Sequence, residues 1–491
     1  MKILLDRQST QPIYQQIRDR IGHFIRSGVL EPGQRLPSIR ALAENTQVNK
    51  LTVIEAYSLL EADGLIYARP GAGYFVNAKP ISTPYKCRSA FAPAQTVIIP
   101  EQRKLSFFDI YTNSMQARRH GEIIDFSSGF TLRSDLDDIQ RVARRAMREI
   151  ADNLFDYDVP EGQLNLRQQI VQLLIHQGLE ISSDNLIITN GAMQGLSLAI
   201  HHYVQPGDWV IVESPTYHGA IAIFQEAKAR VIGIPMGAEG MNLELLAQYL
   251  ESHRPTLIYT ISTLHSPTGI TTSQSHRQQL LSLAEQYDCL ILEDNAYEGL
   301  HFGTVPPSVK AFDRSDRVIY VGTFSKTLMP GLRVGYLVAT GEHYKPLLER
   351  KLLQDLSASR ASQAIVSEYL ASGHYRRHLN RVRANNLQSL NMMLQALETH
   401  FPEEACWTQP EGGILLWVQF PEQVLVKEIC QKAIARHVLV TCGSSFFPDQ
   451  QGYPAMRLSF SHPPDAIEKG IAILGEILKD HLADSKFSRI S

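Results

Sequence analysis

The first eighty residues consist of short amphipathic stretches separated by turn residues. Apolar side chains recur at helical spacing in three successive stretches, residues 12–28, 38–47 and 48–64. Ser38 stands where a helix N-cap is expected. Residues 65–76 then alternate apolar and other positions and are interrupted by proline and glycine, which is typical of a hairpin. Three helices followed by a hairpin predict a winged helix over residues 1–78.

The next segment, residues 79–120, loses this periodicity. Four prolines, Pro80, Pro84, Pro93 and Pro100, interrupt any regular element, so we expect a linker. Its later part, residues 105–115, is aromatic enough to be an arm docked on the domain that follows.

From residue 121 to about 485, strand-like runs alternate with helical stretches. The runs are residues 186–190, 209–214, 230–236, 257–262, 289–294, 318–322 and 335–339. Short β-branched runs separated by helices predict an α/β domain with a mostly parallel sheet. From about Ala371 a long helical stretch and two more strand-like runs predict a smaller α+β lobe.

Composition agrees with a multidomain protein. A chain of 491 residues exceeds what one hydrophobic core usually organises. The net charge of −3 creates no global field that attracts nucleic acid, so contacts with DNA must come from a local patch. The five cysteines form neither a CxxC pair nor a disulfide framework, and we find neither a signal peptide nor a run of transmembrane length. We therefore expect a cytoplasmic protein with no membrane partner.

Candidate DNA-contacting residues occur in the second and third helical stretches and in the hairpin. Helix-turn-helix proteins present short polar and basic side chains to base edges and hold phosphates with cations and backbone amides. The candidates are Arg35, Ser38, Arg40, Asn49, Lys50, Thr52, Arg69, Gly71 and Gly73. The two glycines would let backbone amides approach a phosphate or the minor groove.

The large domain offers the groups that a pyridoxal phosphate needs, namely a lysine for a Schiff base, a carboxylate for the ring nitrogen, a phosphate cradle and a stacked ring. Lys326 lies on a loop after a predicted strand, and Asp294 ends another, where α/β sheets place their ligands. Tyr297 can donate to the phenolic oxygen of the ring, and Tyr217 is the candidate for stacking.

A predicted strand-to-helix turn supplies the candidate phosphate cradle. Backbone amides at a helix N-terminus favour an anion. The residues of this cradle are Gly191, Ala192 and Met193, with Ser325 and Arg333 completing it. Dinucleotide and P-loop fingerprints are absent from the sequence, and the seventeen histidines include no HExxH, so we predict no metal site.

Two resemblances follow from these motifs. Residues 11–78, with PGQRLPSIRALA and TVIEAYSLLEADGLIYARPGAGYFV, resemble the GntR-type winged helix. Residues 121–480 resemble the fold-type I aminotransferases, with GAMQGL, ESPTY, HSPTG, EDNAY, SKTLMPGLRVGY and AMRLSF in that order. The fusion resembles the MocR subgroup of regulators.

These resemblances imply a homodimer, and they imply roles for single residues. Lys326 would be the Schiff-base lysine, Arg457 the partner of a substrate or effector carboxylate, and Tyr157 a residue that reaches the phosphate of the neighbouring subunit. The family commonly has Asn where this chain has Ser266, beside the ring oxygen.

Three functions remain open at this point. The favoured one is a transcription regulator that binds a double-stranded operator and senses pyridoxal phosphate or its adduct with an amino compound. The second is a working aminotransferase with a DNA-binding head. The third is a DNA-binding protein whose body holds no cofactor.

Overall fold

The computed structural model describes residues 13–26, 30, 33–62, 65–69, 73–76, 97–99, 123–129, 136–451 and 453–487. The chain divides into two compact units, which are described separately here as the head and the body. The head is built on residues 1–86, and the body holds almost all of the rest.

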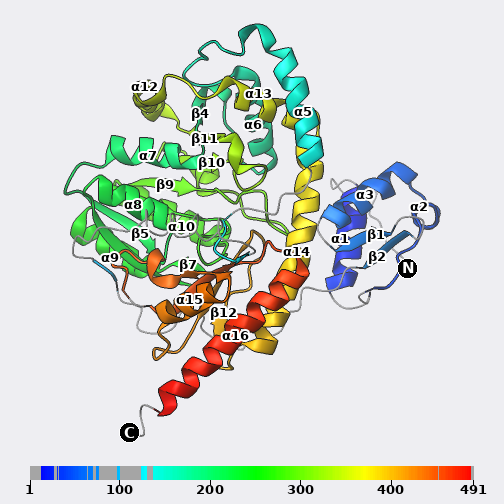
Figure 1. Cartoon of the computed structure of the whole chain (residues 1–491). Coiled ribbons are helices and arrows are strands. Elements are labelled where there is room, and N and C mark those ends of the chain that lie inside the picture. Colours follow the sequence, from blue (N-terminus) through cyan, green and yellow to red (C-terminus); the bar gives the residue numbers. More distant parts are fainter. Residues whose placement is uncertain are drawn as a thin grey trace. The chain divides into compact units, whose positions relative to one another are not determined.

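The head contains the predicted winged helix. Its elements are α1 (Ile13–Arg26), α2 (Ile39–Thr46), α3 (Lys50–Ala62) and the antiparallel strands β1 (Ile66–Arg69) and β2 (Gly73–Val76) (Figure 1). Ser38 caps α2, since its side chain accepts a hydrogen bond from the Ala41 amide. Apolar residues of all three helices and of both strands, among them Ile21 and Leu42, form one buried core.

The body is organised around an eight-stranded sheet in the order β4-β11-β10-β9-β8-β5-β6-β7. The strands are β4 (Leu186–Thr189), β5 (Trp209–Ser214), β6 (Arg230–Gly237), β7 (Gly240–Met241), β8 (Leu257–Thr260), β9 (Leu290–Asp294), β10 (Val318–Thr323) and β11 (Gly335–Val338). The five central strands from β10 to β6 run parallel, whereas β11 is antiparallel to both β10 and β4. The predicted α/β class is confirmed, and the sheet is mixed.

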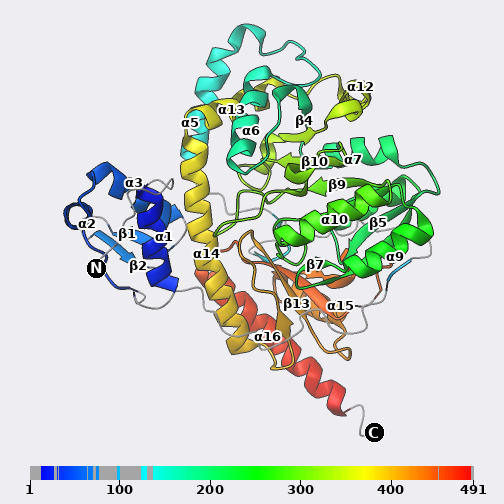
Figure 2. The same cartoon turned by 180° about the vertical axis from the view of Figure 1, so that it is seen from behind.

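Helices cover this sheet, and the two views in Figures 1 and 2 show them from opposite sides. They are α5 (Leu136–Glu149), α6 (Leu164–His176), α7 (Ala192–Tyr203), α8 (His218–Glu226), α9 (Leu243–His253), α10 (Gln274–Gln286), α11 (Val309–Phe312), α12 (Tyr344–Asp355) and α13 (Arg360–Ala371). Short 3-10 helices span Ala151–Asn153, Ser183–Asn185, Pro330–Leu332, Gly341–His343 and Gly443–Phe446.

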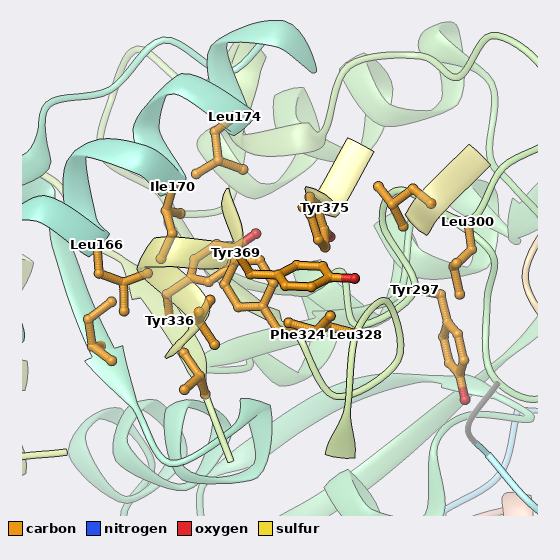
Figure 3. Packing of buried hydrophobic residues seen from close by; sticks show 14 of the residues in the cluster. Leu166, Ile170, Leu174, Tyr297, Leu300, Phe324, Leu328, Tyr336, Tyr369 and Tyr375 are labelled. Carbon is orange, nitrogen blue, oxygen red and sulfur yellow. The ribbon is translucent and has the colours of Figure 1, made fainter. Parts of the chain in front are cut away.

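Neighbouring residues of a strand enter different cores because strand side chains alternate between faces. Ile188 belongs to a core that includes one face of α6, whereas Ile187 belongs to a core that includes α7 and α8. Figure 3 shows Leu166, Ile170 and Leu174 of α6 projecting toward the aromatic residues of the first core. A sheet buried on both faces leaves its strand ends as the place where polar groups can gather.

The C-terminal lobe is the predicted α+β unit. It contains α14 (His374–His400), α15 (Val426–Ala435) and α16 (Pro464–Phe487), with α14 and α16 packed together. A sheet in the order β12-β13-β16-β15 joins β12 (Cys406–Trp407), β13 (Leu415–Gln419), β16 (Ala455–Ser459) and β15 (Thr441–Cys442). A separate parallel pair joins β3 (Ile124–Asp125) to β14 (Val438–Leu439).

Part of the predicted linker pairs with the body. Ile98 exchanges two backbone hydrogen bonds with Gly233 of β6, and Val97 packs on the core beside it. Residues 97–99 therefore do not behave as a free linker, because paired backbone and apolar burial fix them to the sheet edge. The predicted arm over 105–115 lies outside the described residues.

The cysteines differ in one respect from the sequence interpretation. Cys289, Cys430 and Cys442 are free, whereas Cys406 is disulfide-bonded. The absence of a CxxC pair therefore did not exclude a disulfide. Over the described residues, no helix is long and apolar enough to cross a membrane, and His, Cys, Asp and Glu side chains form no cluster suited to a metal ion.

Candidate functional site

Lys326 lies just beyond the end of β10, on the loop that leads to Pro330–Leu332. Its Nζ atom is 5.6 Å from the ring centroid of Tyr297. A Cβ atom at Gly129 would lie 3.4 Å from that Nζ and 3.5 Å from the Tyr297 hydroxyl. The absence of a side chain at Gly129 thus leaves room around the amine. The segments around residues 129, 297 and 326 meet at this point.

Asp294 ends the neighbouring strand β9 and is buried. One carboxylate oxygen accepts a 2.8 Å hydrogen bond from the Tyr259 hydroxyl, and the other accepts a 3.1 Å bond from the Ala296 amide. Burial raises the pKa of Asp294 to about 6, while the Tyr259 hydrogen bond and the charge of Lys326 act in the opposite direction. Near neutral pH this carboxyl group is mostly ionised.

Lys326 and Asp294, which lie at adjacent strand ends, interact electrostatically. Burial, together with the positive charges of Arg457 and Arg333 and against the attraction of Asp294, lowers the pKa of Lys326 to about 8. Near neutral pH about a tenth of this amine is therefore unprotonated, far more than for an exposed lysine, and the unprotonated form is the nucleophile.

Arg457 reaches the same site from β16 of the C-terminal lobe. It is buried, and its Nη2 atom donates to the Ser127 carbonyl and to the Thr441 hydroxyl, the latter at 3.2 Å. Its guanidinium carbon lies 5.1 Å from the ring centroid of Phe446. The buried Nε atom of Arg457 has no hydrogen-bond partner among the described residues, although the charge of Asp125 acts on the guanidinium, so this donor is available to a carboxylate.

The residues of the predicted phosphate cradle meet at the N-terminus of α7. Gly191 is the N-cap residue, and with φ of 79° it adopts a conformation that favours glycine. Arg333 donates from Nη2 to the Asn190 carbonyl at 2.8 Å and from Nη1 to the Ser325 hydroxyl at 3.3 Å. A Cβ atom at Gly191 would lie 2.5 Å from Nη2 of Arg333. A larger residue at position 191 would therefore displace the guanidinium from the N-terminus of α7, where Ala192 and Met193 are the first residues.

Tyr217 precedes α8 and is held against this cradle. Its hydroxyl donates to the Met193 sulfur at 3.5 Å. Burial raises the pKa of Tyr217 to about 12, with Asp294 adding to the effect and Arg457 opposing it. Tyr217 therefore stays neutral near pH 7, and the charges of Asp294, Arg457 and Arg333 all act on its hydroxyl group.

Several buried hydroxyl groups of the body have no hydrogen-bond partner within the described residues. Three of them belong to Ser214 and Thr216, which flank Pro215 at the end of β5, and to Ser266 in the loop after β8. A buried unpaired hydroxyl is costly, so three of them suggest that a polar ligand belongs nearby.

Tyr157 is not brought to this site within the chain. Its side chain is 81% exposed, and its carbonyl accepts a hydrogen bond from Arg360. The predicted contact with a neighbouring subunit requires this kind of exposure and stays a prediction.

The head presents most of its candidate residues on the surface. Arg35, Ser38, Arg40, Asn49 and Lys50 are exposed, and Thr52 is half-buried. Arg35 lies near the hairpin, since a Cβ atom at Gly73 would be 3.6 Å from its Nε. Two candidates lie outside what the structure describes, namely Gly71 and the side chain of Arg69.

Two of these side chains already have local partners. Asn49 caps α3, since its side-chain oxygen accepts from the Leu51 amide at 3.0 Å. Arg40 pairs with Glu44 one turn later at 3.0 Å. An exposed ion pair such as Arg40–Glu44 is weak, so it does not prevent Arg40 from binding a phosphate, and DNA contact by both residues stays a prediction.

Two family models match this chain. The model for aminotransferase class I and II matches residues 121–474, and the model for bacterial regulatory proteins of the gntR family matches residues 13–76. The chain is a GntR-type regulator fused to an aminotransferase class I and II domain. This pairing, on which the resemblance to the MocR subgroup rests, is confirmed, and the aminotransferase family to which the body belongs depends on pyridoxal phosphate.

Relatives of the regulator include both regulators and enzymes. The HTH-type transcriptional regulator YdfD of Bacillus subtilis, itself uncharacterized, is 31% identical over 96% of this chain and 97% of its own length. Aromatic-amino-acid aminotransferase 1 of Thermococcus litoralis is 33% identical over 70% of this chain and 84% of its own.

A solved structure, LysN of Thermus thermophilus, resembles the same part of the regulator. This α-aminoadipate aminotransferase, complexed with N-(5'-phosphopyridoxyl)-L-leucine, matches with a TM-score of 0.71 and 30% identity over 76% of this chain and 95% of its own.

Sequence reasoning missed several residues of the site. Tyr259 supports Asp294, and a buried pair formed by Glu213 and His265, 3.1 Å apart, lies on the neighbouring strands' ends. Glu213 was visible as an acidic residue in an apolar strand, which is a signal of burial with a partner. Tyr259 offered no such signal, because a tyrosine in a strand is ordinary.

Proposed function

We propose that the regulator binds an operator through its winged helix and holds pyridoxal phosphate on Lys326, so that the cofactor or its adduct with an amino compound controls DNA binding. The observation that carries this proposal is the electrostatic coupling of Lys326 with Asp294, Arg333 and Arg457 in one site, in a chain that also has a GntR-type head.

The domain limits of this proposal are residues 1–78 for the head, 79–120 for the connection and 121–485 for the body. Since a DNA-binding regulator acts where the chromosome is, we propose a cytoplasmic location.

The residues present fit pyridoxal phosphate. Gly191, Arg333 and the first amides of α7 form an anion cradle, while Lys326 supplies an amine and Asp294 a carboxylate at adjacent strand ends. Ser266 Oγ, buried and unpaired within the described residues, is suited to the ring oxygen. When bound, this cofactor supplies an aldehyde and an electron-withdrawing ring.

Three side chains of the site have distinct roles in this proposal. Lys326 offers an amine that loses its proton more easily than an exposed lysine does. Asp294, oriented by Tyr259, would hold a proton on the ring nitrogen. Arg457 would bind the carboxylate of an amino compound, since a fork of donors matches two carboxylate oxygens.

A homodimer completes this proposal. Phe155 and Tyr157 are 95% and 81% exposed, and Leu353 of α12 is 89% exposed. Contiguous exposed apolar side chains mark interaction surfaces, and Phe155 and Tyr157 are only two residues apart in the chain. In a dimer, Tyr157 would be available to the partner's cradle.

Control of DNA binding requires that the cofactor or its adduct has different affinities for two states of the protein. The connection over 79–120 would carry such a change to the heads, since it joins them to the bodies along the chain.

The test begins with DNA fragments selected from a random pool with the cofactor-loaded protein. We expect pyridoxal phosphate to change the affinity of the wild type for these fragments at least several-fold. Lys326→Ala should lose the visible absorbance of the lysine-bound cofactor and this response, and Lys326→Arg serves as a matched variant that keeps the charge. An unchanged response in Lys326→Ala would contradict the sensor proposal.

A working aminotransferase is the second candidate, favoured by the enzymes among the relatives. Rapid half-reaction with an ordinary amino acid, followed by recovery with a 2-oxo acid, would support it. Very slow or absent turnover together with a DNA-binding response would support the sensor. A visible spectrum of protein titrated with pyridoxal phosphate tests the third candidate, a body that holds no cofactor.

A further inference from the structure

Two free cysteines meet in the C-terminal lobe. Cys430 is on α15 and is buried, and Cys442 ends β15 and is partly exposed. The Cys442 sulfur is 3.3 Å from the Ser444 hydroxyl. Helix α15 packs against β15, so the two thiols lie on neighbouring elements, and each shifts the pKa of the other.

The two thiols are electronically different. The hydrogen bond from Cys430 lowers the pKa of Cys442 to about 6, with help from Ser444 and the charge of Lys427 against the effect of burial. The same hydrogen bond, followed by burial, raises the pKa of Cys430. Cys442 is therefore the thiol of the pair that ionises more easily, and the thiolate is the form that reacts with oxidants.

We propose that Cys442 and Cys430 are a peroxide-sensitive pair that closes to an intramolecular disulfide. The Cys442 thiolate attacks hydrogen peroxide, the O–O bond breaks, and a sulfenic acid and hydroxide form. The Cys430 sulfur then attacks the sulfenic sulfur, the S–S bond forms, and the proton of the Cys430 thiol leaves with the hydroxyl as water. Two electrons pass from the two sulfurs to the peroxide, and a cellular dithiol would reverse the reaction.

This cysteine pair is next to Arg457, the candidate partner of a ligand carboxylate. Thr441, the residue before Cys442, accepts the 3.2 Å hydrogen bond from Arg457. After Cys442, the carbonyl of Phe446 accepts from the Thr216 amide at 2.8 Å, and the Phe446 ring lies edge-on to His218. A covalent bond at Cys442 would therefore fix the segment that orients Arg457.

The chain between these contacts has little freedom to absorb a shift. A Cβ atom at Gly443 would lie 2.4 Å from the Ala455 carbonyl oxygen of β16, so the backbone after Cys442 is pressed against that strand. The proposal goes beyond the regulator function and does not need a bound cofactor.

The chain supplies an internal control. Cys289 is buried, and burial raises its pKa to about 12. It is also free, so it should remain a thiol under conditions that oxidise a thiolate. Trypsin cleaves after Lys427, Lys432, Arg436 and Arg457, so Cys430 and Cys442 fall on separate peptides.

The experiment treats the full-length protein with one to five equivalents of hydrogen peroxide, blocks remaining thiols with iodoacetamide and maps tryptic peptides without reduction. We expect residues 428–432 and 437–457 to appear as one linked peptide, lighter by two hydrogens than their sum, while Cys289 stays fully alkylated. Cys442 oxidised to sulfinic acid with Cys430 still alkylated would overturn the proposal, as would oxidation of Cys289 before Cys442.

Two variants separate the roles of the pair. In Cys430→Ser, Cys442 should stop at the sulfenic acid and be trapped by dimedone, whereas in Cys442→Ser, Cys430 should stay unoxidised. In the wild type, oxidation should slow amide hydrogen exchange in residues 438–446 at least several-fold, and Cys289→Ser should behave as the wild type does. Equal oxidation of Cys430 with and without Cys442 would contradict the order of steps.

Discussion

The head and the body differ in the exposure of their candidate functional residues. In the head, most of the candidate residues that the structure describes are exposed, and the three helices and two strands of the head share one small core. In the body, Asp294 and Arg457 are buried, and burial shifts the pKa values of Asp294 and Lys326 toward neutrality. A surface that binds DNA depends on many weak contacts, whereas a buried site depends on a few strong ones.

The largest expected effect comes from breaking either core. Ile21 of the head and Ile170 of the body are both fully buried, so replacing either with alanine should destabilise its own unit by about 2–5 kcal/mol. All three tryptophans, Trp209, Trp407 and Trp417, lie in the body, so tryptophan fluorescence during urea unfolding follows the body alone. Ile170→Ala should shift this transition and Ile21→Ala should not.

Hydrogen exchange of residues 13–62 follows the head in the same samples. Exchange that is faster in Ile21→Ala with an unchanged fluorescence transition would establish two separate units. An equal shift of the fluorescence transition in both variants would mean that the units unfold together.

The next effect concerns the buried carboxylate. Asp294→Asn keeps the shape of the side chain and removes its charge, so the affinity for pyridoxal phosphate should fall by about 10- to 100-fold, since charged hydrogen bonds contribute roughly 1.5–3 kcal/mol. Titration of the visible absorbance measures this. The control Asp137→Asn changes an exposed carboxylate on α5 and should leave the affinity unchanged.

A smaller effect is expected at the DNA surface. Lys50→Ala removes one exposed charge at the start of α3, so DNA affinity should fall by about 1 kcal/mol and the slope of log K against log salt by about 0.9. Fluorescence anisotropy at several salt concentrations gives both values. Lys345→Ala, an exposed lysine of α12, is the matched control, and equal effects of the two variants would show that Lys50 makes no specific contact.

The smallest expected effect is a shift in the pH dependence of pyridoxal phosphate capture by Lys326. Because the pKa of Lys326 is lowered from 10.5 to about 8, its reactive unprotonated form grows as pH rises and is nearly complete at a lower pH than for an exposed lysine. The rate of pyridoxal phosphate capture, corrected for that of a free amine, should therefore level off above about pH 9. A rate that still rises steeply at pH 10 would place the amine in an ordinary solvent environment.

The same contrast explains what the sequence could predict. The head follows from local signals, since Ser38 caps a helix and glycines punctuate a hairpin, and α1 to β2 occur where the pattern predicts them. The positions of Lys326 and Asp294 followed from the rule that ligands bind beyond strand ends.

Other features depended on contacts that no local pattern encodes. The hydrogen bond from Tyr259 to Asp294, the antiparallel strand β11 and the pairing of Ile98 with β6 each join segments far apart in the chain. The contact between Cys430 and Cys442 is of the same kind. Burial of such groups also sets their pKa values, which composition and spacing do not reveal.

The central claim is that one lysine of the body captures the cofactor. Protein loaded with pyridoxal phosphate, reduced with borohydride and digested with trypsin should carry the phosphopyridoxyl label on Lys326, in a ratio near one label per chain. Label spread over exposed lysines such as Lys345, with Lys326 unmodified, would contradict the account.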